Sequence, residues 1–367
     1  MKYWRGYLVA AIVAACSWGL ESFAKGHSEL VDMVYPYVTR MAQSYLANWS
    51  ASVSFCVWQV LLLVLIVLVL ASAVLMFLFK WNPIQGLGWV LACVFAVGFL
   101  NTAMYGLNEF SSPLAADIQL ETAEYKYTVS ELNDAAIFYR DKANELATQV
   151  SRDEKGNVIY PEFSELALQA ANGFENLTYK QFYPVFAGSL LPVKTLDWSG
   201  YFTNKGTDGV TIALTGEAAV NPETPTVWMP FTMCREMARR MCIATEHDAN
   251  FAAFLACSAN DSVEFQYAAY LMAYRYCHEA MVDIAAASDQ YSLHNLEKDV
   301  SSQLQHDLDV CKKFFGKKAE LDGETCDLLV VWHIQKYVLP LLQEEEAAPF
   351  DPLDESAVDL SGLANAR

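Results

Sequence analysis

Two long stretches of the chain, residues 53–79 and 87–105, contain no charged residue and are mostly apolar. An α-helix needs roughly 20 such residues to cross the hydrocarbon core of a bilayer, so each stretch is long enough to span a membrane. The turn-like pair Asn82-Pro83 lies between them. The pattern therefore predicts a helical hairpin in the membrane.

A third and shorter apolar segment, expected to be a helix over about residues 6–22, follows Lys2 and Arg5. It has the form either of a spanning helix or of the apolar part of a signal peptide. Residues 13–16, Val-Ala-Ala-Cys, resemble a lipoprotein cleavage box. We favour a third spanning helix, because a cleaved lipoprotein would gain little from an additional hairpin. Residues 1–105 then form a membrane anchor.

The few basic residues near these segments set the expected orientation. Lys2, Arg5 and Lys80 would be cytoplasmic, because basic residues in short loops tend to stay inside the cell. The rest of the chain would then lie outside. We expect a multi-pass protein of a bacterial cell membrane with an extracytoplasmic C-terminal domain, residues 106–342, and the lipid bilayer as a partner.

Helical periodicity dominates this C-terminal domain. Thr128 and Glu131 have capping-box spacing, which predicts a helix start. The expected helices are residues 132–150, 163–172, 231–243, 248–259, 264–287, 293–315 and 325–342. Residues 190–230 are rich in Gly, Thr, Pro and Asn with short β-branched runs, which indicates loops and a few short strands. The fold class is therefore mainly α with a small β element, and the acidic tail, residues 343–367, has little to bury and is expected to be disordered.

Charge and cysteine usage exclude several functions. The formal net charge is −19, and the residues after Tyr105 carry about −21. Nucleic-acid binding relies on Lys and Arg that release counterions from phosphates, so nucleic acid is not an expected partner. None of the nine cysteines forms a C-x-x-C pair of the kind found in zinc ribbons or redox sites. We expect most of them to be small buried hydrophobic residues.

The most informative segment is residues 230–257. Pro230-Phe231-Thr232 leads into residues 235–239, Arg-Glu-Met-Ala-Arg, and residues 248–251, Asp-Ala-Asn-Phe, follow. With residues 199–202 and 215–221, this segment resembles DUF3810, a bacterial family of unknown function in which the lead-in precedes H-E-x-A-H and an acidic-A-N-F motif comes next. The three-helix anchor also resembles that family.

The family pattern is similar to zinc peptidases of the gluzincin type, which have an H-E-x-x-H helix and a glutamate ligand on the next helix. This resemblance implies a zincin-like domain. It places two metal-ligand positions on Arg235 and Arg239, the third on Glu246, and the general-base position on Glu236. Supporting positions fall on Asp248 and Asn250.

The sequence departs from this pattern at both histidines. An arginine is protonated at physiological pH and has no lone pair to donate, so neither Arg235 nor Arg239 can coordinate zinc. The family implies zinc, and the sequence predicts that it is lost here, with no other cofactor in its place. Residues 240–242, Arg-Met-Cys, replace the Gln, Arg and Gly that often follow the motif, and the lost glycine suggests that the helix exit has drifted.

Two arrangements of the arginines are open. Arg235 and Arg239 can pair with Glu236 and Glu246 in a buried cluster of forked hydrogen bonds, or they can form a solvated basic face together with Arg240. Histidines elsewhere do not recur at a spacing that makes a relocated metal site. No local pattern pairs a cysteine with a histidine as a nucleophile.

The leading functional hypothesis is a membrane-anchored pseudopeptidase that binds a peptide or protein without cleaving it, as a sensor or scaffold. Its cleft would lie beside residues 209–221, with Glu217 and Asn221 as candidate residues. One alternative is an active zinc-dependent metallopeptidase with a non-standard ligand set. The other is a subunit of a membrane complex in which the hairpin is the functional part.

Overall fold

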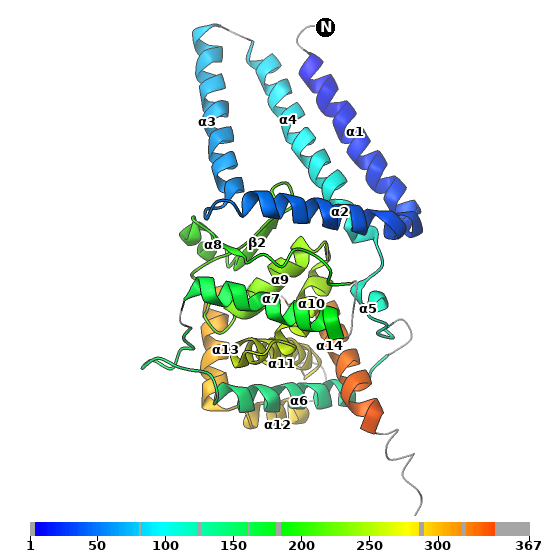
Figure 1. Ribbon diagram of the computed structural model, residues 1–367, viewed down its shortest axis with the longest axis vertical. Coiled ribbons are helices and arrows are strands. Elements are labelled where there is room, and N and C mark those ends of the chain that lie inside the picture. Colours follow the sequence, from blue (N-terminus) through cyan, green and yellow to red (C-terminus); the bar gives the residue numbers. More distant parts are fainter. Residues whose placement is uncertain are drawn as a thin grey trace, which may run out of the picture.

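Three apolar helices stand together at one end of the protein (Figure 1). The computed structural model describes residues 4–80, 82–122, 126–160, 162–180, 185–285, 290–316 and 321–341. Helices α1 (Arg5–Gly26), α3 (Val57–Leu78) and α4 (Pro83–Met104) each have 22 residues and the composition of membrane spans. At 1.5 Å per residue each is about 33 Å long, which matches a hydrocarbon core of roughly 30 Å.

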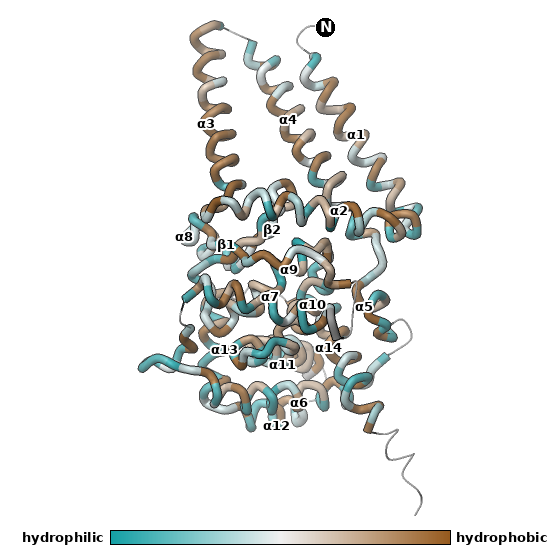
Figure 2. The backbone as a smooth tube through the Cα atoms, in the orientation of Figure 1, coloured by the Kyte–Doolittle hydropathy of each residue, from teal (hydrophilic) through white to brown (hydrophobic). Residues whose placement is uncertain are grey.

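Helices α1 and α4 pack closely along much of their length. A Cβ atom on Gly6 would lie 2.5 Å from the carbonyl carbon of Gly88, so only glycine permits this approach. Helix α3 is apolar along nearly its whole length (Figure 2), and none of its spanning segment is buried against the rest of the described chain.

Helix α1 is longer than the sequence predicts. The expected first helix, residues 6–22, is part of a helix that continues through Cys16 to Gly26.

A helix that the sequence analysis did not anticipate, α2 (Ser28–Ser50), connects α1 to α3. It lies across the lower ends of the spans, between them and the C-terminal domain (Figure 1). The fold therefore has three layers: the spans, the crosswise helix α2, and the C-terminal domain.

The C-terminal domain is mainly helical, as predicted. Its helices are η2 (Gly106–Phe110), α5 (Leu114–Asp117), α6 (Val129–Ala147), α7 (Phe163–Lys180), α8 (Ser199–Asn204), α9 (Met229–Arg240), α10 (Glu246–Ser258), α11 (Val263–Ala285), α12 (Gln290–Lys298), α13 (Ser302–Phe315), α14 (Gly323–His333) and a final π-helical turn, η4 (Ile334–Val338). The single helix expected over residues 293–315 is wrong. It is broken into α12 and α13, because the Ser301 hydroxyl accepts a hydrogen bond from the Leu304 N–H and starts a new helix.

The capping box at the start of α6 is confirmed. The Thr128 hydroxyl accepts a hydrogen bond from the Glu131 N–H at 3.3 Å, and the Glu131 carboxylate accepts one from the Thr128 N–H at 2.7 Å. Helix α6 packs along α11 through its apolar face. The predicted tail, residues 343–367, lies outside the described residues.

The β element is a sheet of three short strands in the order β1-β3-β2. Strand β1 (Lys194–Thr195) is parallel to the central strand β3 (Glu217–Val220), and β2 (Gly209–Ile212) is antiparallel to it. All four residues of β3 are buried, whereas β2 is an edge strand that packs against α9.

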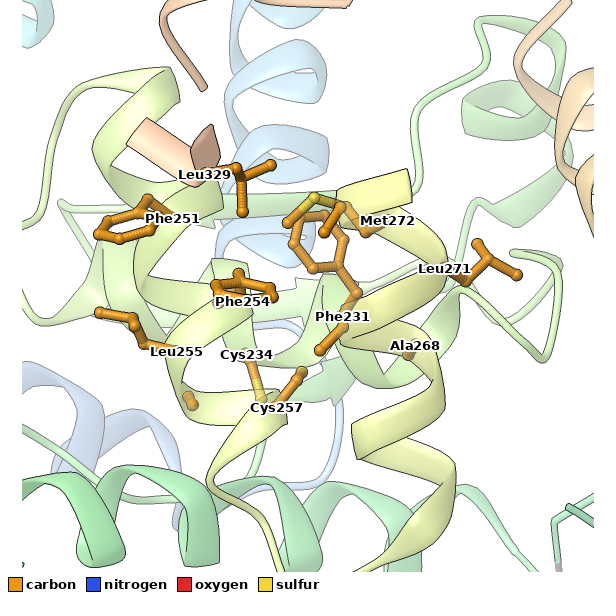
Figure 3. Packing of buried hydrophobic residues seen from close by; sticks show 14 of the residues in the cluster. Phe231, Cys234, Phe251, Phe254, Leu255, Cys257, Ala268, Leu271, Met272 and Leu329 are labelled. Atoms are coloured by element: carbon orange, nitrogen blue, oxygen red, sulfur yellow. The ribbon is translucent and has the colours of Figure 1, made fainter. Parts of the chain in front are cut away.

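Helices α9 and α10 pack against α11 and α14 in the main core. Figure 3 shows Phe231 and Cys234 of α9 beside Phe254 and Cys257 of α10, with Leu329 of α14 close to Phe251. The six cysteines of the domain, Cys234, Cys242, Cys257, Cys277, Cys311 and Cys326, are buried free thiols, as expected. The core thus fixes both helices that carry the candidate site.

Candidate functional site

The two motif helices meet at a tight turn. Helix α9 ends at Arg240, and Cys242 has a positive φ of 70°, the left-handed conformation that glycine favours at this position. The Cys242 N–H donates to the Arg239 carbonyl at 2.9 Å and the Ile243 N–H donates to the Ala238 carbonyl at 3.1 Å, which is a Schellman turn. The expected drift of the helix exit is therefore not seen, because Cys242 itself adopts the glycine conformation.

Arg235 lies inside the domain in a compact ion cluster. Its Nη2 atom donates to Asp208 Oδ1 at 2.7 Å and to Glu236 Oε1 at 2.9 Å, and its Nε donates to the same Glu236 oxygen at 3.1 Å. Only 11% of the Arg235 side chain is exposed. Asp208 is held in turn by the Thr232 hydroxyl, which donates to Oδ2 at 2.7 Å. The guanidinium group is therefore bound by two carboxylates.

Glu236, the general-base position, is fully buried. Its Oε1 atom accepts the hydrogen bonds from Arg235, and its Oε2 accepts one from the Thr211 hydroxyl of β2 at 2.8 Å. A Cβ atom on Gly209 would lie 2.7 Å from Glu236 Cγ, so the glycine lets β2 approach α9 at this point. Both oxygens are thus occupied by hydrogen bonds within the protein and are out of reach of solvent.

The charges in this cluster stabilise one another. Burial by itself raises the pKa of Asp208, but the Arg235 guanidinium and the hydrogen bond from Thr232 more than offset it and hold that pKa below its usual value. Burial alone would lower the pKa of Arg235, and the carboxylates of Asp208 and Glu236 raise it instead. Asp208 and Arg235 are therefore both charged at neutral pH.

Arg239 lies one turn further along α9 and nearer to solvent. It donates to Glu246 at the start of α10, with 24% of the arginine side chain and 55% of the glutamate side chain exposed. Both residues line a cavity of about 630 Å³. Tyr105 and Glu109, from the short segment that follows the span α4, also line it. This outer ion pair is thus accessible and lies close to the membrane anchor.

Arg240 points away from both ion pairs. It is buried, and its Nη2 atom donates to the backbone carbonyls of Ser189 and Leu191. Burial lowers its pKa to about 10. The alternative of a solvated basic face is therefore wrong: Arg235 and Arg240 are inside the domain and Arg239 is paired.

Comparison with known proteins places the chain in a family. The sequence model of DUF3810, described as a protein of unknown function, matches residues 31–328. The chain belongs to the DUF3810 family. The match begins within α2, includes the spans α3 and α4, and ends within α14. No curated protein and no solved structure matches the chain.

The supporting residues of this DUF3810 member lie on α10. Asn250 is buried and donates to the Tyr276 hydroxyl at 3.1 Å and to the Thr325 hydroxyl at 3.3 Å, so it joins α10 to α11 and α14. Asp248 is buried in the first turn of α10, where the Thr245 hydroxyl accepts a hydrogen bond from its N–H. Its side chain borders two further cavities, of about 550 Å³ and 470 Å³.

The two residues expected near a cleft are buried in this DUF3810 member. Glu217 accepts hydrogen bonds from the N–H groups of Val57 and Trp58, at 2.8 Å and 2.9 Å, and forms an ion pair with Lys194 at 2.7 Å. It therefore fastens the start of the span α3 to the sheet. Asn221 donates to the Thr203 hydroxyl of α8 at 2.9 Å and to the Thr207 carbonyl at 3.1 Å, and so holds the loop after α8. Neither residue lines the three cavities described above.

The residues at the motif do not fit a zinc ion. Two of the three ligand positions carry guanidinium groups without lone pairs, and the third, Glu246, is engaged by Arg239. Within the described ranges of the chain, no three His, Cys, Asp or Glu side chains lie together as metal ligands would. Asp208 is the residue of this site that sequence reasoning missed, since only the fold brings it to Arg235, 27 positions away.

Proposed function

We propose that this DUF3810 member is a membrane-anchored pseudopeptidase, a metallopeptidase-like domain that binds a peptide segment without hydrolysing it. The observation that carries the proposal is the burial and hydrogen bonding of the Glu236 carboxylate. Where a peptidase needs an accessible base, this carboxylate is buried with both oxygens hydrogen-bonded to Arg235 and Thr211. The two positively charged arginines stand in place of a dication and neutralise carboxylates of the same helix pair.

The ligand-binding part of the proposal rests on the outer ion pair. Arg239 and Glu246 present both signs of charge beside a cavity of about 630 Å³, which suits a peptide with its alternating donors and acceptors. The C-terminal domain is proposed to face outward from a bacterial membrane, because Lys2, Arg5 and Lys80 favour the cytoplasmic side. A ligand would then come from the cell envelope, as a sensor or scaffold requires.

Zinc content tests the non-catalytic part. The full chain in lipid nanodiscs is exposed to zinc, desalted and analysed by plasma mass spectrometry. We expect the wild type to retain no more zinc than Arg235→Gln/Arg239→Gln, and Arg235→His/Arg239→His to gain about one ion per chain, because histidine supplies the missing lone pairs. The Gln pair is the matched control, since it removes the same two charges without adding ligands.

Two outcomes would reject this part. One is a stoichiometric zinc ion in the wild type that Glu246→Gln removes. The other is a folded Arg235→His/Arg239→His chain that gains no zinc, which would mean that the two helices are not arranged as in a metallopeptidase.

Peptide selection tests the binding part. A random peptide library displayed on phage is selected on the full chain in nanodiscs, with Arg239→Glu as the counter-selected variant. We expect enriched peptides that bind the wild type, lose affinity for Arg239→Glu and stay intact on incubation. Enrichment no greater than on empty nanodiscs would contradict peptide binding, and chelator-sensitive cleavage would favour the metallopeptidase alternative.

One observation favours a second candidate, a subunit of a membrane complex. Within the membrane α3 stands largely apart from α1 and α4, and none of its apolar spanning window is buried, so most of its surface there is available to another membrane protein (Figure 1). Replacing residues 57–104 by an unrelated hairpin while keeping Glu217 as the cap of α3 separates the two candidates. Function that survives the exchange would argue against the complex subunit.

A further inference from the structure

Helix α2 has its apolar side chains on the outside of the protein. Between Leu30 and Tyr45 seven side chains are exposed, and every one of them is a large hydrophobic residue: Leu30, Met33, Val34, Tyr37, Val38, Met41 and Tyr45. Leu30, Met33, Tyr37, Met41 and Tyr45 are three or four positions apart, and Val34 and Val38 are next to two of them, so the seven side chains lie on one side of the helix. Met41 is 69% exposed and Tyr45 is 75% exposed. A helix on the surface of a water-soluble domain shows the opposite arrangement.

The polar side of α2 faces the C-terminal domain. Gln43 is buried, and its Nε2 atom donates to the Ala213 carbonyl at 2.9 Å. Arg40 Nε donates to the Met241 carbonyl at the end of α9 at 3.1 Å, and the Thr39 hydroxyl donates to Asn108 Oδ1 at 3.2 Å. The apolar side therefore cannot turn inward without breaking these hydrogen bonds.

Chain connectivity restricts how α2 lies relative to the bilayer. Its 23 residues are about 34 Å long at 1.5 Å per residue. The seven steps from Ser50 to Val57, where α3 begins, reach about 24 Å even when fully extended. Because α1 leaves and α3 enters the membrane on the same side, an upright α2 could not return the chain to the bilayer. The helix must run largely parallel to the membrane surface, as it does in Figure 1.

We propose that α2 is an interfacial helix, with Met33, Tyr37, Met41 and Tyr45 inserted among the headgroups and upper acyl chains of the same bilayer that α1, α3 and α4 span. Helices of this kind place an apolar face a few ångströms into the membrane while their polar face remains outside. Tyrosine and tryptophan are enriched at this depth, and Tyr37, Tyr45 and Trp49 are all exposed on α2. The polar face here is covered by the protein's own C-terminal domain in place of water.

This placement has a consequence for the candidate site. Arg40 connects the membrane-facing helix to the backbone turn that follows Arg239 and Arg240. A second cavity, of about 470 Å³, is lined by Tyr37 and Arg40 of α2 and by Asp248 of α10, among others. The C-terminal domain therefore lies against the bilayer surface, with this cavity next to the membrane-facing helix α2.

Photocrosslinking to lipid tests the proposal in the full chain. A photoreactive amino acid replaces Met41 or Tyr45, the protein is reconstituted in nanodiscs of defined phospholipids, and adducts are identified by mass spectrometry after irradiation. Phe77, an exposed residue of the span α3, is the positive control, and Tyr291, an exposed residue of α12 in the C-terminal domain, is the negative control. We expect lipid adducts at Met41 and Tyr45 within a few-fold of the yield at Phe77, and none at Tyr291.

Three results would overturn the proposal. Adducts with water alone at Met41 and Tyr45, while Phe77 yields lipid adducts, would place α2 outside the bilayer. Adducts with a second copy of the chain in place of lipid would make this face a dimer interface. In cell membranes, adducts with another protein in place of lipid would make it a protein-docking surface.

Discussion

Arg235 and Arg239 lie one helical turn apart on α9, yet their surroundings differ. Arg235 is bound by Asp208 and Glu236, both buried, whereas Arg239 is bound by Glu246, which is largely exposed beside a cavity. The two arginines therefore take part in two separate sets of ion pairs. The inner pair belongs to the framework of the domain, and the outer pair is the part that a ligand can reach.

The difference in burial gives the two pairs different energetic roles. Charges inside a protein lose their hydration, so removing one partner leaves the other uncompensated at high cost. Charges near the surface are solvated and screened, and an exposed ion pair contributes about 0–1 kcal/mol. Mutations of Arg235 and Arg239 should therefore change the stability of the fold by different amounts, although both residues are arginines.

The largest effect is expected for Arg235→Ala. Removing this guanidinium group leaves the buried carboxyl groups of Asp208 and Glu236 without their positive partner, which should lower the free energy of unfolding by about 3–5 kcal/mol. Unfolding of the full chain in detergent can be followed by the reaction of a thiol dye with the buried cysteines. Arg239→Ala is the matched control on the same helix. Equal losses for both variants would contradict the distinction between inner and outer pairs.

A smaller and pH-dependent effect is expected for Asp208→Asn. The pKa of Asp208 is lower in the folded protein than in the unfolded chain, where an aspartate titrates near about 3.9. Its carboxylate therefore stabilises the fold above that pH, and this contribution is lost as the pH falls toward the lowered pKa. We expect the wild type to be more stable than Asp208→Asn at pH 7 and the difference to shrink below about pH 4. A difference that stays constant from pH 7 to pH 3 would show that Asp208 is not stabilised by its charge.

The elements that the sequence predicted are those with a local signal. The spans follow from uninterrupted apolar composition, and the start of α6 follows from Thr128 and Glu131, which contact each other directly. Helix α2 was missed although its apolar residues recur at helical spacing. Pro36 and the charges of Asp32 and Arg40 interrupt the apolar run, so hydropathy alone gives no signal there.

The parts of the site that sequence could not provide depend on contacts between distant segments. Asp208 meets Arg235 only because β2 packs against α9. Glu217 lies in a segment that resembles the family, but its partners Val57 and Trp58 lie about 160 positions earlier, at the start of a span. The resemblance identified where the chemistry of the motif would lie, while the fold determined which carboxylate each arginine binds.

The smallest effect is expected for the outer pair, where Arg239→Gln, Glu246→Gln and the double variant form a double-mutant cycle. Because Glu246 is largely exposed, the coupling energy between the two side chains should be below about 1 kcal/mol and should fall further as salt is raised. Unfolding of the four chains in the same detergent at low and high salt measures it. A salt-independent coupling of about 3 kcal/mol or more would mean that this pair is desolvated like the inner one. In that case Arg239 would belong to the framework of the domain, and the cavity beside it would lose the accessible charge on which peptide binding is proposed.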